Sequence, residues 1–225
     1  MNPVGMTERI VEAGGQGGLA APLQVALFLG GMALLSSALV TLTAFTRIVI
    51  VLSFVRRALA TQEIPPTPVL LGLSMFLTFF VMGPTFENIE KKALSPYLAK
   101  ECTVEDAFQR GWGELRVFMM KQTRKGDLGL FLDLARIGKI STPDDVPARV
   151  LIPAFVTSEL KTAFIMGFCL YVPFLLIDLV VAVILMSLGM MMMPPVVVST
   201  PLKLLLFVLV DGWPVLLRSL SLSFS

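Results

Sequence analysis

Long runs of apolar residues, interrupted by charges and prolines, constrain this chain more than any other feature. The first run extends from Leu19 to Leu42 without a charged residue, which exceeds the roughly 20 residues that a helix needs to cross the hydrocarbon of a bilayer. Hydrophobic residues make up 56% of the 225 residues and charged residues only 15%. One small core cannot hide so much apolar surface, so lipid or partner subunits must cover it. We therefore predict an all-α, membrane-associated protein.

The apolar runs divide the chain into four parts. The N-terminal part is polar and rich in glycine, and it lacks the apolar core and small-residue cleavage site of a secretory signal, so we expect a retained, flexible tail. A first pair of hydrophobic segments follows, then a polar region, then a second hydrophobic hairpin. The boundaries are 1–18, 19–86, 87–150 and 151–225.

Prolines mark the connections inside the two hydrophobic parts. Pro65 and Pro66 lie in a polar loop that begins at Arg56, and Pro194 and Pro195 separate the apolar runs 163–188 and 196–210. Proline interrupts helices and restricts the residue before it. The second pair therefore predicts a turn that joins two apolar segments into a hairpin.

The central region, residues 87–150, has nearly balanced charges and should be exposed to water. Apolar residues recur in it at helical spacing, which predicts two amphipathic helices. The first set is Phe108, Trp112, Leu115, Phe118 and Met119, and the second is Leu128, Phe131, Leu132 and Ala135. Arg56 and Arg57 favour a cytoplasmic position for their loop, so the central region would face the periplasm.

Several charges lie where apolar sequence predicts a membrane. Arg47, Asp178 and Lys203 interrupt apolar runs, and Glu159 and Lys161 flank the third run closely. An isolated charge at mid-bilayer costs about 3 kcal/mol on insertion scales, so such residues are normally paired or face a cavity. Three interpretations remain open: an ion or proton site of a transporter at Asp178, charge pairs between subunits, and ion pairs within one subunit.

Enzymatic and nucleic-acid functions find little support. The chain has no histidine, which removes the commonest general base and zinc ligand. Its two cysteines, Cys102 and Cys169, lack metal-ligand spacing, and two unpaired thiols are a simpler interpretation than a disulfide. No phosphate-binding loop or catalytic constellation is present, and a net charge of +2 without a basic stripe does not suggest nucleic acid. We expect no catalysis, metal or cofactor.

Four consecutive methionines, Met190, Met191, Met192 and Met193, precede Pro194. Flexible thioethers commonly fill irregular apolar gaps, and this is the simpler interpretation. Alternatively, several copies of the turn could meet at one axis, where soft methionine side chains would seal a pore and deform around a moving chain. The spacing alone does not decide between these alternatives.

Particular sequence motifs resemble the FliP family of flagellar biosynthetic proteins. They include TRIVIVLSFVR from Thr46, FLTFFVM from Phe76, IPAFVTSELKTAF from Ile152 and LFVLVDGW from Leu206. The resemblance covers roughly residues 45–224. Relatives in virulence-type III secretion share the prolines and the Ser-Glu-Leu-Lys core, but the phenylalanine-rich second segment is more similar to the flagellar branch.

This resemblance implies a subunit of the flagellar type III export gate in the bacterial inner membrane. It implies a pentamer, assembled with FliQ and FliR family membrane proteins into a helical, cone-shaped channel for unfolded flagellar proteins. By the same resemblance, Met190, Met191 and Met192 match a gasket that closes the channel, and Met193 extends it. A virulence-type export subunit and, more remotely, a secondary transporter are the alternatives.

Overall fold

The computed structural model describes residues 21–61, 64–138, 142, 145–190 and 192–224, and no strand occurs among them. The expected all-α fold is confirmed. The chain divides into two units at Val40, which are described separately. The described part of the N-terminal unit is most of α2 (Ala21–Thr41), a helix without charged residues that corresponds to the first apolar run. The predicted polar tail lies outside the described residues.

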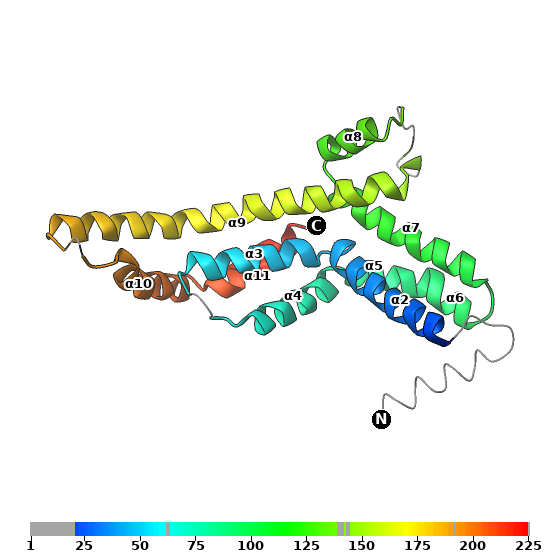
Figure 1. Cartoon of the computed structure of the whole chain (residues 1–225), viewed down its shortest axis with the longest axis horizontal. Coiled ribbons are helices and arrows are strands. Elements are labelled where there is room, and N and C mark those ends of the chain that lie inside the picture. The colour runs from blue at the N-terminus through cyan, green and yellow to red at the C-terminus, as the bar shows by residue number, and fades with distance from the viewer. Residues whose placement is uncertain (1–20, 62–63, 139–141, 143–144, 191, 225) are drawn as a thin grey trace, which may run out of the picture. The chain divides into compact units, whose positions relative to one another are not determined.

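The second unit is organised around α9 (Ala148–Ser187), a helix of 40 residues (Figure 1). The helix α3 (Phe45–Ala58) packs along α9, and α4 (Thr67–Val81) packs on α3. After the carboxyl-terminal end of α9, α10 (Pro195–Leu209) returns antiparallel to it. The chain then continues through a turn at Asp211 into α11 (Gly212–Leu222). Pro65 and Pro66 lie between α3 and α4.

The polar region forms several helices that belong to the same unit. They are α5 (Gly83–Ile89), the π-helix η1 (Glu90–Leu94), α6 (Ser95–Leu98), α7 (Val104–Gln122) and α8 (Lys125–Leu134). Both predicted amphipathic helices are present as α7 and α8, and both pack against α9. Figure 1 shows them at the amino-terminal end of that helix.

The π-helix was not predicted, but its position has a physical explanation. Pro96 has no N–H group to donate to the carbonyl of Lys92, four residues earlier. The Ser95 N–H instead bonds to the Glu90 carbonyl, one residue beyond the α-helical partner. Arg110 Nη1 lies 3.5 Å from the Lys92 carbonyl oxygen and supplies a donor to it.

The helix α9 begins 15 residues before the third apolar run, which was expected to start at Ala163. Its first turns are amphipathic: Leu151, Phe155, Ser158 and Glu159 recur at helical spacing and are fully buried. The helix continues through Pro153 and Pro173. A glycine permits its close packing on α3, because a Cβ atom at Gly167 would lie 2.5 Å from the Phe54 ring.

Among the described residues, α9 is the one helix that by itself is long and apolar enough to cross a membrane. Up to four spans result if each bent pair of helices counts as one. Two such pairs lie within the second unit. The first pair, residues 67–81 and 83–98, is bent by 60°, and the second, 195–209 and 212–222, is bent by 67°.

Candidate functional site: buried charge pairs and the methionine loop

The first buried ion pair joins Arg47 of α3 to Glu159 of α9. Arg47 Nε donates to Glu159 Oε2 at 2.9 Å, and Arg47 Nη2 donates to the other carboxylate oxygen. The two side chains are only 2% and 0% exposed. Such a two-pronged contact uses the planar fork of the guanidinium, which lysine cannot reproduce.

The remaining N–H groups of Arg47 bind two other parts of the fold. Arg47 Nη2 also donates to Gln122 at the end of α7, at 3.1 Å. Arg47 Nη1 donates to the carbonyl and hydroxyl oxygens of Ser223, at 2.8 and 3.0 Å. The guanidinium carbon lies 3.8 Å from the centroid of the Phe224 ring, and Gln122 Nε2 donates to the Phe224 carbonyl. All five guanidinium donors are therefore satisfied, and one side chain connects α3, α7, α9 and the segment after α11.

The second ion pair lies in the hairpin of α9 and α10. Lys203 Nζ donates to Asp178 Oδ2 at 2.5 Å, and Ser199 Oγ donates to Asp178 Oδ1 at 2.6 Å. Lys203 is 3% exposed and Asp178 is 32% exposed. Because Ser199 and Lys203 are four residues apart, they lie on the same face of α10 and reach one carboxylate together.

These contacts bear on the three interpretations of the charges. Arg47, Glu159, Asp178 and Lys203 each find an oppositely charged partner within the same subunit, so internal pairing accounts for them without a neighbouring chain. Lys161 is exposed and joins neither cluster. The two pairs are separate: Arg47 contacts Glu159, and Lys203 contacts Asp178.

Sequence reasoning did not find Gln122, Ser199, Ser223 and Phe224, which complete these clusters. A signal existed for Ser199, because it precedes Lys203 by four residues on a helix that was expected to be apolar. No sequence signal indicated the other three residues, because they approach Arg47 only through the packing of segments distant in sequence.

The methionine loop connects α9 to α10. Gly189 follows α9 with a φ of +76°, where glycine is favoured. The Met190 N–H bonds to the Leu185 carbonyl and the Gly189 N–H to the Met186 carbonyl, the two bonds of a Schellman motif. Pro194 caps α10, and Pro195 is its first residue, a position that tolerates proline because no helical partner is lost there.

Three methionine side chains at this tip are exposed. Met192 is 99% exposed, Met190 41% and Met193 39%, while Met191 lies outside the described residues. An open cavity of about 640 Å³ is lined by Met190, Met192 and Met193, together with Gly189, Pro194 and Val197. The tip thus presents thioether side chains outward instead of packing them into the subunit.

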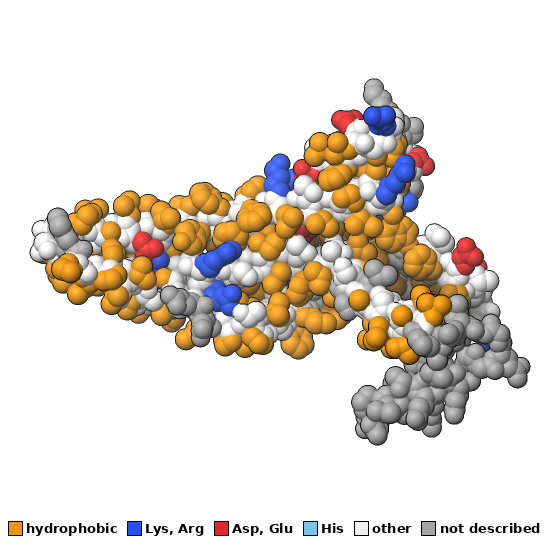
Figure 2. Space-filling model, viewed as in Figure 1, with side chains coloured by type: hydrophobic (Ala, Val, Ile, Leu, Met, Phe, Trp, Pro, Cys, Tyr) orange, Lys and Arg blue, Asp and Glu red, His pale blue; other side chains and the backbone are white. Residues whose placement is uncertain are grey.

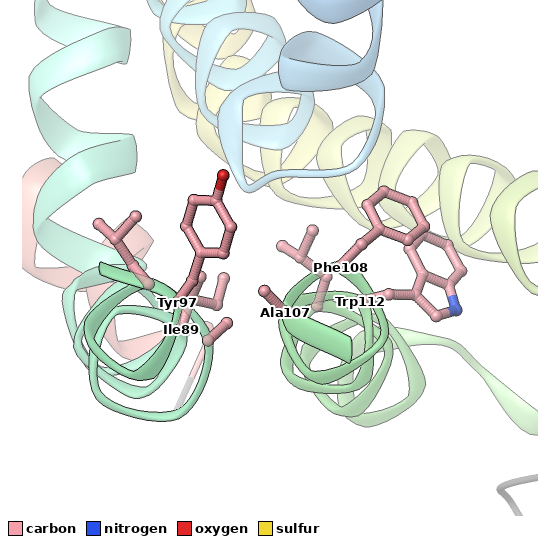
Figure 3. A pocket seen from close by; sticks show the side chains of 9 residues that line it. Ile89, Tyr97, Ala107, Phe108 and Trp112 are labelled. Atoms are coloured by element: carbon pink, nitrogen blue, oxygen red, sulfur yellow. The ribbon is translucent and has the colours of Figure 1, made fainter. Parts of the chain in front are cut away.

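A second, smaller cavity of about 300 Å³ lies in the polar region between η1, α6 and α7. Figure 3 shows Ile89 and Tyr97 on the helix at one side of it and Ala107, Phe108 and Trp112 on the helix at the other side. Apart from Tyr97 and Trp112, its lining residues carry no polar side-chain atom. The cavity suits an apolar group and offers no pair of acid and base.

The surface of the second unit is strongly apolar over α9 and α10, whereas charged side chains are more frequent near α8 (Figure 2). Many large hydrophobic residues of these two helices are exposed, among them Phe168, Leu176, Leu179, Leu205 and Val208. Cys102 and Cys169 are both unpaired. Within the described part of the chain, no three His, Cys, Asp or Glu residues are grouped so that they could hold a metal ion.

Comparison with known proteins identifies the family. Residues 28–220 match the model of the FliP family. The chain is 54% identical over 202 residues to the flagellar biosynthetic protein FliP of Pectobacterium carotovorum subsp. carotovorum, with 90% of this chain and 78% of that protein covered. It is 53% identical over 186 residues to the protein of the same name from Bacillus subtilis (strain 168), with 83% and 84% covered.

A third relative is longer. The chain is 50% identical over 221 residues to the flagellar biosynthetic protein FliP of Buchnera aphidicola subsp. Acyrthosiphon pisum (strain APS), and it spans 58% of that protein's length. The match to the family model covers most of the chain, including both buried ion pairs and the methionine loop. This chain therefore belongs to the FliP family.

Proposed function

We propose that this chain is a subunit of the flagellar type III export gate in the bacterial inner membrane. Several copies, five by the family resemblance, would assemble with FliQ and FliR family proteins around a channel for unfolded flagellar proteins. The family assignment supports this proposal, since the relatives are named flagellar biosynthetic proteins. The exposed apolar surface of α9 and α10 supports it as well, because lipid or partner helices must cover that surface.

The observation that carries the channel proposal is the exposure of the methionines at the tip of an apolar hairpin. Filler methionines would be buried in gaps, but Met192 is almost fully exposed. When copies of the tip meet at one axis, their thioether side chains form a gasket. Such a gasket stops small solutes and deforms around a passing polypeptide, because methionine has several rotatable bonds and no branching.

The polar region, residues 87–150, is proposed to face the periplasm. Its helices carry most of the charges near the amino-terminal end of α9, whereas Arg56 and Arg57 lie in the last turn of α3, just before the connection to α4. Cysteines introduced at exposed Lys121 and exposed Arg57 can be labelled from each side of the membrane. Labelling of the Lys121→Cys variant from the cytoplasm alone contradicts this orientation.

The assembly is tested by the mass of the particle purified in detergent after expression with FliQ and FliR family partners. The export gate requires a particle that contains several copies of this chain. A monomer that binds no partner overturns the gate and favours a transporter.

The gasket is tested by leakage of small solutes through the closed assembly. The triple variant Met190→Ala, Met191→Ala, Met192→Ala should leak, because alanine cannot fill the axis. The matched control replaces three exposed methionines elsewhere, Met32, Met75 and Met186, by alanine, and should not leak. Equal leakage from both variants, or none from the first, contradicts the gasket.

A further inference from the structure

The contact between α9 and α10 is a narrow seam with a single polar link. The buried residues of α10 are Ser199, Lys203 and Phe207, spaced by four residues along one face. On α9, Asp178 shares its face with buried Val181 and Leu185, three and seven residues further on. The other seam residues are apolar, and apolar side chains can pack nearly as well in several alignments of α10 along α9.

The polar link specifies one alignment of the two helices. Asp178 accepts from Lys203 with one oxygen and from Ser199 with the other. Moving α10 by one turn, about 5.4 Å, would leave the Lys203 ammonium beside apolar side chains of α9. A buried charge without its partner is costly, whereas apolar neighbours are exchanged at little cost. The seam thus resembles a coiled coil in which one polar position fixes the register.

An aromatic contact lies in the same register. Phe174 is one turn before Asp178, Phe207 is one turn after Lys203, and their ring centroids are 6.4 Å apart. The Phe207 ring also touches Gly212, where a Cβ atom would approach it to 2.3 Å. The aromatic contact anchors the open end of the hairpin, and the polar link lies between that end and the methionine loop.

We infer that Asp178, Lys203 and Ser199 act as positioning residues that fix the register of α10 on α9 and thereby the height of the methionine loop along the channel axis. This inference rests on the proposed gasket. Asp178 lies nine residues before the end of α9 and Lys203 eight residues after the start of α10, which places the link about 12–14 Å from the loop. Because both arms are helical between the link and the tip, a shift at the link moves the methionines.

The register is measured directly by disulfide cross-linking in the membrane-embedded assembly. In a background with Cys102→Ser and Cys169→Ser, a Val196→Cys substitution is combined with single cysteines at positions 181–189. The native register should give maximal cross-linking at Leu185, which opposes Val196 at the same offset that pairs Asp178 with Lys203. The Lys203→Met and Asp178→Asn variants should shift the maximum by three or four positions or spread it over several. They should also leak small solutes.

Two further variants separate positioning from general damage. The exchange Asp178→Lys with Lys203→Asp retains an opposite pair and should restore the maximum at Leu185 and the closed state. Leu202→Ala, at an exposed neighbouring residue, should change neither. An unchanged cross-linking maximum in both Lys203→Met and Asp178→Asn overturns the inference. Absence of leakage from the methionine triple variant overturns the gasket alone, because the cross-linking pattern still reports the register.

Discussion

Arg47 binds both carboxylate oxygens of Glu159 across 112 residues of sequence, and neither side chain reaches solvent. The pair joins α3 to the first third of α9, and Gln122 and Ser223 bring α7 and the C-terminal segment to the same guanidinium. Four parts of the second unit therefore depend on one cation. Separating any of these parts from the Arg47 guanidinium would leave a buried charge or hydrogen-bond donor unsatisfied.

Replacing Arg47 by methionine should lower the free energy of unfolding by about 3–5 kcal/mol, because Glu159 then remains as a buried, unpaired carboxylate. Replacing both residues, Arg47→Met with Glu159→Leu, should cost less than the single change. Unfolding in detergent, followed by the fluorescence of Trp112 and Trp213, measures both effects. The exposed Arg57, whose guanidinium lies over the Phe54 ring, is the control: Arg57→Met should cost no more than about 1 kcal/mol. A double variant that is less stable than Arg47→Met would contradict this account.

Replacing Gly167 by alanine should destabilise the packing of α3 on α9. The added Cβ atom would lie 2.5 Å from the Phe54 ring, and relief of such overlap typically costs about 1–3 kcal/mol. Gly72 in α4 has open space around its missing Cβ atom, so Gly72→Ala should stabilise the protein by up to about 1 kcal/mol through helix propensity. The same unfolding measurement tests both, and equal effects of the two substitutions would refute the close contact.

Replacing Ser158 by alanine should loosen the start of α8. Ser158 Oγ accepts from the Arg124 N–H at 3.0 Å and donates to Asp127 at 2.8 Å, so a side chain of α9 caps a helix that is distant in sequence. Loss of a helix cap costs about 1 kcal/mol. Hydrogen exchange of the α8 amides should accelerate while that of the α10 amides stays unchanged. The neighbouring substitution Thr157→Ala is the control, and equal acceleration by it would remove the special role of Ser158.

Replacing Thr103 by valine should raise the pKa of Asp106 toward its ordinary value. The Asp106 N–H donates to Thr103 Oγ1 at 3.1 Å and the Thr103 N–H donates to Asp106 Oδ2 at 3.3 Å, which forms a capping box at the start of α7. Thr103 Oγ1 also donates to Asp106 Oδ2 at 2.8 Å. The side-chain hydrogen bond from Thr103, aided by the Thr103 N–H, lowers the pKa of Asp106 in the folded state. NMR titration of the Asp106 carboxyl measures the change.

The sign of the pH dependence follows from this lowered pKa. The capping box adds stability above the unfolded pKa of aspartate, and this stability is lost as the pH falls through the lower, folded pKa. The protection factors of the amides in the first turn of α7, which correct for the intrinsic pH dependence of exchange, should therefore fall in acid. The Thr103→Val variant should lose this dependence. Thr142→Val, which removes the hydrogen bond to Asp145, should leave the titration of Asp106 unchanged.

Local pattern predicted much of the helical framework. The spacing of apolar residues indicated α7 and α8, and the paired prolines before Val196 indicated the turn between α9 and α10. The amino-terminal extension of α9 to Ala148 was missed, because its buried face is amphipathic and lies outside the apolar run. The helix α11 was missed because it follows a turn at Asp211, where a left-handed residue other than glycine changes the direction of the chain.

The sequence by itself determined that this chain is helical, that lipid or partner subunits must cover its apolar surface, and that charges such as Arg47 and Lys203 need partners. These conclusions follow from composition and periodicity, which act locally along the chain. Only the tertiary structure decided which partner each charge has, since Glu159 and Asp178 were both available to either cation. Hydrogen-bond geometry selects among them, and that geometry exists only after α3, α9 and α10 have packed.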